Sequence, residues 1–301
     1  MQESGPRGDS AEASLDPTDH LIDAATKDGL LGRYGSDWVA GLPDLIARLA
    51  KDNKWKIISR LVGGRTACVL IVEVHGQRAV VKVTPDIERS ARELAALEVL
   101  SQYASGPRVL QQWIDSAGSV ESSVAVLELI GDGQSIRDTP TMQVPSEALA
   151  RLLTEVALCG TTPLPVPLES LESHLVWRLG KPRGGGLHGA PPATASELEQ
   201  ARSILTDLVD SMVGGIWVHG TLHPGNLIVR DDKVWAIDPR PFQGDSAYDV
   251  AELALKWGSE RKGRAHNIAD GLVLLEELRE HCYFDKQRAI SWMQVIFTTG
   301  V

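Results

Sequence analysis

Two oxygen-bearing residues at the ends of a predicted hairpin could hold a metal ion. Asn226 directly precedes the apolar run 227–230, and Asp238 directly follows the run 234–237. The polar turn 231–233 between the runs predicts a β-hairpin, whose two outer ends lie side by side. A carboxamide and a carboxylate there, together with a phosphate-bearing ligand, would make a hard oxygen site suited to Mg²⁺. If only this pair is considered, the alternative remains that Asn226 is a turn residue and that Asp238 is a cap before proline.

The loop before the hairpin has the outline His-Gly-x-x-x-x-x-Asn over residues 219–226. Protein kinases place a catalytic aspartate five residues before a metal-binding asparagine. Thr221 stands at that position in this chain. Threonine has no carboxylate, and its hydroxyl is not a general base near neutral pH. The loop therefore predicts a phosphoryl-transfer site in which a threonine stands where the catalytic aspartate is expected.

The composition narrows the class of partner. The chain has 301 residues, enough for one large domain or two lobes, and its 43% hydrophobic and 23% charged residues are ordinary for a soluble globular protein. A formal net charge of −10 argues against nucleic acid as the main partner and permits a cationic small substrate. No apolar run approaches the ~18 residues that cross a bilayer, and the start has no signal-peptide pattern. Three dispersed cysteines suit a reducing cytoplasm and form neither a zinc pattern nor a disulfide framework.

The first part of the chain predicts a leader and a small α+β lobe. Residues 1–28 are polar and acidic without sustained periodicity, which is typical of a disordered leader. The lobe, residues 29–130, begins with apolar residues at helical spacing over 38–49. Its further pattern predicts strands at 55–62, 68–74, 79–83, 109–114 and 123–130, with a helix at 87–103.

The second part, residues 131–301, predicts a mainly helical lobe around the hairpin. It starts at Gly131-Asp132-Gly133, a natural hinge between two lobes. Apolar residues at helical spacing predict helices at 148–159, 195–213, 248–256, 267–281 and 286–297.

Three runs near the hairpin carry a family resemblance. They are residues 219–226, Ile-Asp-Pro-Arg-Pro at 237–241 and Gly-Asp-Ser-Ala-Tyr-Asp-Val-Ala at 244–251, with weaker support from 63–66 and 92–97. Through them the chain resembles the aminoglycoside phosphotransferase family, most closely the branch of streptomycin kinases and hydroxyurea phosphotransferases. The resemblance covers roughly residues 36–300. It implies a bilobal, protein-kinase-like α+β fold with ATP between a strand-rich N-lobe and a mainly helical C-lobe.

The resemblance assigns a lysine and a glutamate to the ATP phosphates. It places Lys82 against the phosphates and Glu93 in an ion pair that holds the lysine in place. Glu88 or Glu98 could pair instead, because helix register read from sequence is uncertain by a few residues. The pattern around Lys82 by itself equally favours a solvent-facing edge position for this side chain.

The resemblance also assigns backbone contacts to the nucleotide. Gly63 and Gly64 would let backbone N–H groups approach the phosphates, although two adjacent glycines between strands are by themselves more typical of a simple turn. Backbone groups at Glu128 and Leu129, where an apolar strand reaches the hinge, would be available to the adenine edge.

At the catalytic loop, the resemblance implies that Asn226 and Asp238 bind Mg²⁺ that bridges the phosphates. His219 is expected to brace the loop rather than to take protons, because the family uses an aspartate for that work. We expect His223 to support the same loop and Asp249 to hydrogen-bond it.

The activity that the resemblance implies is transfer of the ATP γ-phosphoryl group to a hydroxyl of a small polar acceptor. The family carries an aspartate at position 221, and general-base catalysis is typically worth ~10²–10⁴-fold. With Thr221 there, we expect turnover to be impaired while ATP and Mg²⁺ still bind. The alternative is a catalytically inactive, pseudokinase-like protein that binds nucleotide. Neither interpretation involves nucleic acid or a membrane.

Overall fold

The computed structural model describes residues 21–61, 66–117, 120–181, 193–212, 215–262 and 267–300. The chain divides into two compact units: unit 1 combines Met1–Pro85 with Ile114–Val124, and unit 2 combines Asp86–Trp113 with Ala125–Val301. Residues 1–20 of the expected leader lie outside the described part, and residues from Ala24 onward are already helical. The expected lobe boundaries at 28 and 130 stay a prediction.

Unit 1 begins with two helices. Helix α1 (Ala24–Tyr34) starts where Asp23 accepts a hydrogen bond from the backbone N–H of Thr26, which satisfies one of the unpaired donors of the first turn. Helix α2 (Ser36–Asp52) buries an apolar stripe and leaves its other face polar. The helix predicted over 38–49 is thereby confirmed. The buried stripe comprises Trp38, Val39, Leu42, Ile46 and Leu49.

Strands β1 (Lys56–Arg60), β2 (Cys68–Val74) and β3 (Gln77–Thr84) form the predicted antiparallel meander. The β2–β3 turn places His75 and Gly76 at φ 50° and 79°, the left-handed geometry of a tight two-residue hairpin. The complete sheet has the order β1-β2-β3-β5-β4, where β4 is Val109–Asp115 and β5 is Ser122–Glu128. Because β3 lies between β2 and β5, Lys82 is not on an edge strand.

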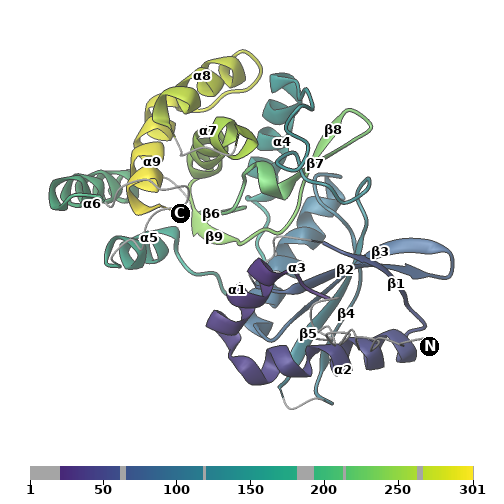
Figure 1. Cartoon of the computed structure of the whole chain (residues 1–301). Helices are drawn as coiled ribbons and strands as arrows, with labels where there is room; N and C mark the ends of the chain where they lie inside the picture. Colours follow the sequence, from purple (N-terminus) through teal and green to yellow (C-terminus); the bar gives the residue numbers. More distant parts are fainter. Residues whose placement is uncertain are drawn as a thin grey trace, which may run out of the picture. The chain divides into compact units, whose positions relative to one another are not determined.

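Unit 2 is mainly helical (Figure 1). The six predicted helices at 87–103, 148–159, 195–213, 248–256, 267–281 and 286–297 are confirmed over their described residues; α5 was not predicted. Helices α8 and α9 both pack on α7, and α6 packs on α9 (Figure 1). None of the helices in the described ranges is long and apolar enough to cross a membrane. The helices are α3 (Ile87–Gln102), α4 (Ser146–Cys159), α5 (Leu171–Leu179), α6 (Ala195–Asp210), α7 (Ser246–Lys262), α8 (Ile268–Arg279) and α9 (Lys286–Thr299).

Two small antiparallel pairs complete unit 2. The predicted hairpin consists of β7 (Leu227–Arg230) and β8 (Lys233–Ala236), joined by Asp231 and Asp232 at φ 53° and 59°. These values belong to a two-residue turn that matches the twist of the strands. The second pair, β6 (Ile216–Val218) with β9 (Phe242–Gly244), was not predicted, because three-residue strands leave little periodicity to detect.

Candidate active site

The two strand pairs bring the predicted catalytic loop and the segment around Asp238 together. Loop 219–226 runs from the end of β6 to the start of β7, and residues 237–241 run back from the end of β8 to the start of β9. The backbone N–H of Ile237 donates to the carbonyl of Asn226 at 2.9 Å, and that of Arg240 donates to the carbonyl of His219 at 2.9 Å. The two segments are therefore joined at both ends.

Three of the predicted site residues meet between these segments. The hydroxyl of Thr221 donates to the carbonyl oxygen of Asp238 at 2.8 Å. The side-chain nitrogen of Asn226 donates to the carbonyl oxygen of Thr221 at 2.9 Å. Asn226 thus uses its amide nitrogen within the loop, which leaves the amide oxygen for a ligand. Asp238 has a left-handed φ of 54°, a conformation that aspartate tolerates better than most residues.

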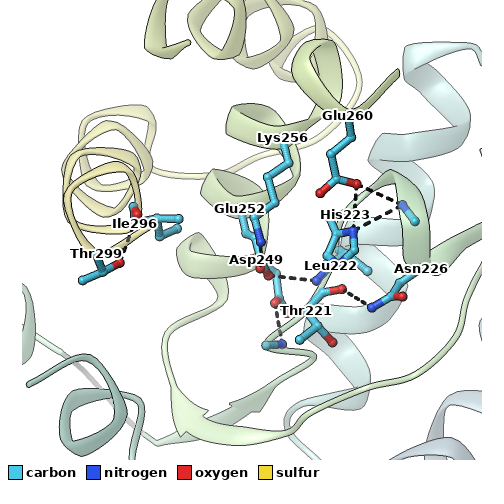
Figure 2. Close-up of polar contacts among 12 residues, drawn as sticks. Thr221, Leu222, His223, Asn226, Asp249, Glu252, Lys256, Glu260, Ile296 and Thr299 are labelled. Atoms are coloured by element: carbon cyan, nitrogen blue, oxygen red, sulfur yellow. Dashed lines mark hydrogen bonds and ion pairs between the residues drawn. The ribbon is translucent and has the colours of Figure 1, made fainter. Parts of the chain in front are cut away.

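Helix α7 holds the start of the loop with two buried carboxyl groups (Figure 2). Asp249 accepts hydrogen bonds from the backbone N–H groups of His219 and Gly220 at 2.7 and 2.9 Å. One helical turn further along, Glu252 accepts from the backbone N–H of Leu222 at 2.8 Å. The hydrogen bonds that we expected from Asp249 to the loop are confirmed. The role of Glu252 was missed, although its i,i+3 spacing from Asp249 could have indicated it.

The two carboxyl groups of α7 differ in their electrostatics. Burial raises the pKa of Asp249 to about 7, even though the N–H donors of the loop act in the opposite direction. Burial also disfavours the charged form of Glu252, but the ammonium group of Lys256, 2.7 Å away, and the nearby imidazole of His223 together outweigh burial and lower the pKa of Glu252. An ion pair and a carboxyl group that titrates near neutrality therefore lie beneath the loop.

His219 lies completely buried at the start of the loop. Burial lowers the pKa of its imidazole to about 4, so the ring is neutral near neutral pH. Its Nε2 atom is buried and has no hydrogen-bond partner among the described residues. A buried neutral imidazole suits the bracing role that we expect for His219 better than proton exchange with an acceptor.

The neighbouring glycine explains how the loop passes so close to the Asp238 segment. Gly220 has a φ of 74°, and a Cβ atom added to it would lie 2.2 Å from the carbonyl oxygen of Arg240. Only glycine combines this left-handed conformation with so close an approach of two backbones.

The residues expected at the ATP phosphates are divided between the two units. Lys82 is half-buried on β3 in unit 1, and Glu93 lies on α3 in unit 2, where its side chain is 3% exposed. The two alternatives on the same helix are exposed: Glu88 pairs with Arg92 at 3.0 Å, and Glu98 accepts from Gln112 at 3.4 Å. Pairing of Lys82 with Glu93 stays a prediction. Gly63 and Gly64 lie outside the described residues.

The side chain of Glu128 is engaged within unit 2. Its carboxylate pairs with Arg108 at 3.1 Å and with Arg230 at 3.2 Å, and its backbone N–H donates to the carbonyl of Arg108 at 2.9 Å. Arg230 also lies over the ring of Trp235. Contact of the Glu128 or Leu129 backbone with an adenine stays a prediction. Nothing in the sequence indicates these ion pairs, because the partners are 20 and 102 residues from Glu128.

Residues 54–299 match the sequence profile of a family described as aminoglycoside/hydroxyurea antibiotic resistance kinase. Streptomycin 6-kinase of Streptomyces griseus is 26% identical over 287 residues, which cover 91% of this chain and 86% of that protein.

Solved kinases share the fold at low sequence identity. Aminoglycoside phosphotransferase APH(3'')-Id from Streptomyces rimosus has a TM-score of 0.56 at 16% identity, covering 86% of this chain and 98% of its own. A thermostable mutant of APH(4)-Ia, solved with ADP and hygromycin B, has a TM-score of 0.58 at 13% identity, covering 83% and 88%. Amicoumacin kinase hAmiN, in complex with AMP-PNP and Ca²⁺, has a TM-score of 0.58 at 12% identity, covering 85% and 83%.

These likenesses establish the bilobal, protein-kinase-like α+β fold that the sequence predicts. The profile match extends over both the strand-rich sheet and the helices that hold the catalytic loop. The chain belongs to the aminoglycoside/hydroxyurea antibiotic resistance kinase family.

Proposed function

We propose that this protein transfers the γ-phosphoryl group of ATP to a hydroxyl of a small polar acceptor, at a rate that Thr221 lowers. The observation that carries the proposal is the hydrogen-bonded group of Thr221, Asn226 and Asp238, which the two strand pairs hold at one place. Fold neighbours that contain ADP and hygromycin B, or ADP and streptomycin, support the same chemistry. A net charge of −10 favours a cationic acceptor of that kind.

The donor atoms at this place fit a divalent cation. The amide oxygen of Asn226 and the carboxylate of Asp238 are hard ligands and would hold Mg²⁺ together with the phosphates. The cation would neutralise negative charge that develops on the transferring phosphoryl group. The chain itself keeps the two ligands in register, through the hairpin pairing and through the hydrogen bond from Asn226 to the loop.

Thr221 limits the rate because of the hydrogen bond that it makes. Its hydroxyl already donates a proton to the carbonyl of Asp238, and a neutral alcohol is a very weak proton acceptor. A catalytically inactive nucleotide-binding protein is the second candidate, favoured by the same hydrogen bond. Lys82, Asn226 and Asp238 serve nucleotide binding in both candidates, so turnover distinguishes the two.

The test begins with ligand binding and proceeds to turnover. AMP-PNP with Mg²⁺ should raise the melting temperature of the full chain, and Asp238→Asn should reduce that rise. The matched control is Asp232→Asn in the exposed hairpin turn, where asparagine also tolerates a positive φ. ADP release should then depend on an added acceptor, with streptomycin and hydroxyurea as probes. Binding without any acceptor-dependent ADP release would favour the inactive protein, and no binding would contradict both candidates.

A further inference from the structure

We propose that His223, oriented by Glu260, takes the proton of the attacking hydroxyl in place of the carboxylate that position 221 lacks. The inference rests on the proposed phosphoryl transfer and names the group that acts as its general base. It concerns only the proton-transfer step. The two side chains involved contact each other, one from the loop and the other from α7.

His223 lies on the same accessible stretch of the loop as Thr221. Burial alternates along this stretch: Gly220, Leu222 and Pro224 are buried, whereas Thr221 and His223 are half-buried. His223 has an extended backbone, with φ −145° and ψ 165°. Alternation of this kind puts residues two apart on the same side of an extended chain. Thr221 and His223 are therefore the two side chains of this stretch that an acceptor can approach.

The contact with Glu260 orients the imidazole. His223 Nδ1 lies 3.0 Å from Glu260 Oε2, with side-chain exposures of 18% and 11% (Figure 2). The backbone N–H of Gly225 lies 3.2 Å from Nδ1 and 3.3 Å from Oε2, and it donates to the carboxylate oxygen whenever Nδ1 carries a proton. Burial disfavours the charged form of Glu260, but the hydrogen bond and the charges of His223, Lys256 and Arg137 outweigh it and lower its pKa to about 2.

The ionised carboxylate decides which nitrogen carries the proton. An unprotonated Nδ1 only 3.0 Å from a carboxylate oxygen would bring two lone pairs together, so the proton lies on Nδ1 and is donated to Glu260. The lone pair then remains on Nε2, which points away from the carboxylate of Glu260 because the two ring nitrogens lie on different sides of the imidazole. A carboxylate behind an imidazole also stabilises the positive charge that appears when Nε2 gains a proton.

The surrounding charges are consistent with a proton acceptor at this place. Glu260, Glu252 and Lys256 face His223 from α7, where Glu252 and Lys256 pair with each other at 2.7 Å. Arg137 approaches from the segment after β5, and its guanidinium group lies beside Gly225. His219, the other imidazole of the loop, is completely buried and cannot reach an acceptor.

The step balances without any further reactant. The acceptor oxygen forms a bond to the γ-phosphorus of ATP as the bond from that phosphorus to the β,γ-bridging oxygen breaks, and ADP leaves. The proton of the acceptor hydroxyl passes to Nε2 of His223 and from there to solvent. The imidazole returns to its neutral form for the next cycle.

The first test compares single variants in the full chain, with Mg²⁺-ATP and with streptomycin or water as the probe acceptor. His223→Gln and Glu260→Gln should lower ADP release by about tenfold or more, within the range of general-base catalysis. The rise in melting temperature with AMP-PNP and Mg²⁺ should stay unchanged. The control, His281→Gln on an exposed residue, should keep full turnover. Added imidazole should restore part of the turnover of His223→Ala.

The second test separates proton transfer from a merely structural role. In a Thr221→Asp background the new carboxylate takes the proton, so His223→Gln should cost much less than in the native background. Equal losses in the two backgrounds would overturn the inference, as would full turnover in His223→Gln. Nucleotide binding without turnover in the native chain would also overturn it, whereas absence of nucleotide binding would refute the proposed function itself.

Discussion

Replacing Thr221 with aspartate should slightly lower the free energy of unfolding and strongly raise the turnover of phosphoryl transfer. The threonine hydroxyl donates to the carbonyl oxygen of Asp238 at 2.8 Å in a half-buried position. A net hydrogen bond of this kind contributes about 1 kcal/mol, and aspartate cannot replace it, because an ionised carboxylate has no proton to donate. The new carboxylate must also turn away from that carbonyl. We therefore expect Thr221→Asp to cost about 1–2 kcal/mol of unfolding free energy.

The gain in catalysis should exceed this cost. A general base contributes ~10²–10⁴-fold, which corresponds to about 3–5 kcal/mol of activation free energy. Thr221→Asn is the matched control, because asparagine has nearly the same size and shape but accepts no proton. Both variants should lose a few degrees of melting temperature. Only Thr221→Asp should raise turnover, by ~10²-fold or more once a suitable acceptor is present.

Steady-state ADP release and melting temperature with AMP-PNP and Mg²⁺ measure the two effects separately. The change should appear in turnover and little in nucleotide affinity, because the carboxylate acts on the acceptor hydroxyl. Equal turnover of Thr221→Asp and Thr221→Asn, with nucleotide bound in both, would refute the reasoning. So would the loss of a robust activity in Thr221→Ala, since the threonine would then be a working catalytic group.

Three further predictions concern the structure around the loop. Gly220→Ala should cost ~2–5 kcal/mol in urea unfolding, because its left-handed φ is strained for alanine and the new Cβ would lie 2.2 Å from the carbonyl oxygen of Arg240; an unchanged urea midpoint would contradict the close approach. The pKa of Glu260 is lowered in the folded protein to about 2 from 4.5, so the stability that it contributes is complete above about pH 4.5 and is lost as pH falls toward 2. The difference in unfolding free energy between the native protein and Glu260→Gln should shrink across that window, and a constant difference would disprove the assignment. Arg288→Met should destabilise the protein by ~3–5 kcal/mol in the same assay, because it leaves the carboxylate of Asp245, only 11% exposed, without its guanidinium partner.

Much of the framework could be predicted from local pattern. The hairpin of β7 and β8 follows from two apolar runs around a polar turn predicted at 231–233, and the structure confirms the hairpin with a shorter turn, Asp231 and Asp232, because Lys233 already pairs with Arg230. The helices follow from apolar residues at helical spacing, as α2 shows with its buried stripe. Asn226 and Asp238 flank the hairpin for the same reason, since strand pairing alone brings its ends together.

Contacts between residues far apart in sequence could not be predicted in this way. The ion pairs of Glu128 and the three-residue pairing of β6 with β9 depend on packing that leaves no periodic signal. Helix α5 was missed as well, because its nine residues lie next to a stretch rich in proline and glycine.

The sequence by itself determined the elements, the family signature and the absence of a carboxylate at Thr221, because these depend on residue types and short-range spacing. Only the tertiary structure decided what surrounds that threonine: a backbone carbonyl that accepts its proton, and a helix whose carboxyl groups hold the loop from behind. It also decided that His223 meets Glu260, because the packing of α7 against the loop brings together two residues that are 37 positions apart, and local pattern does not encode this packing.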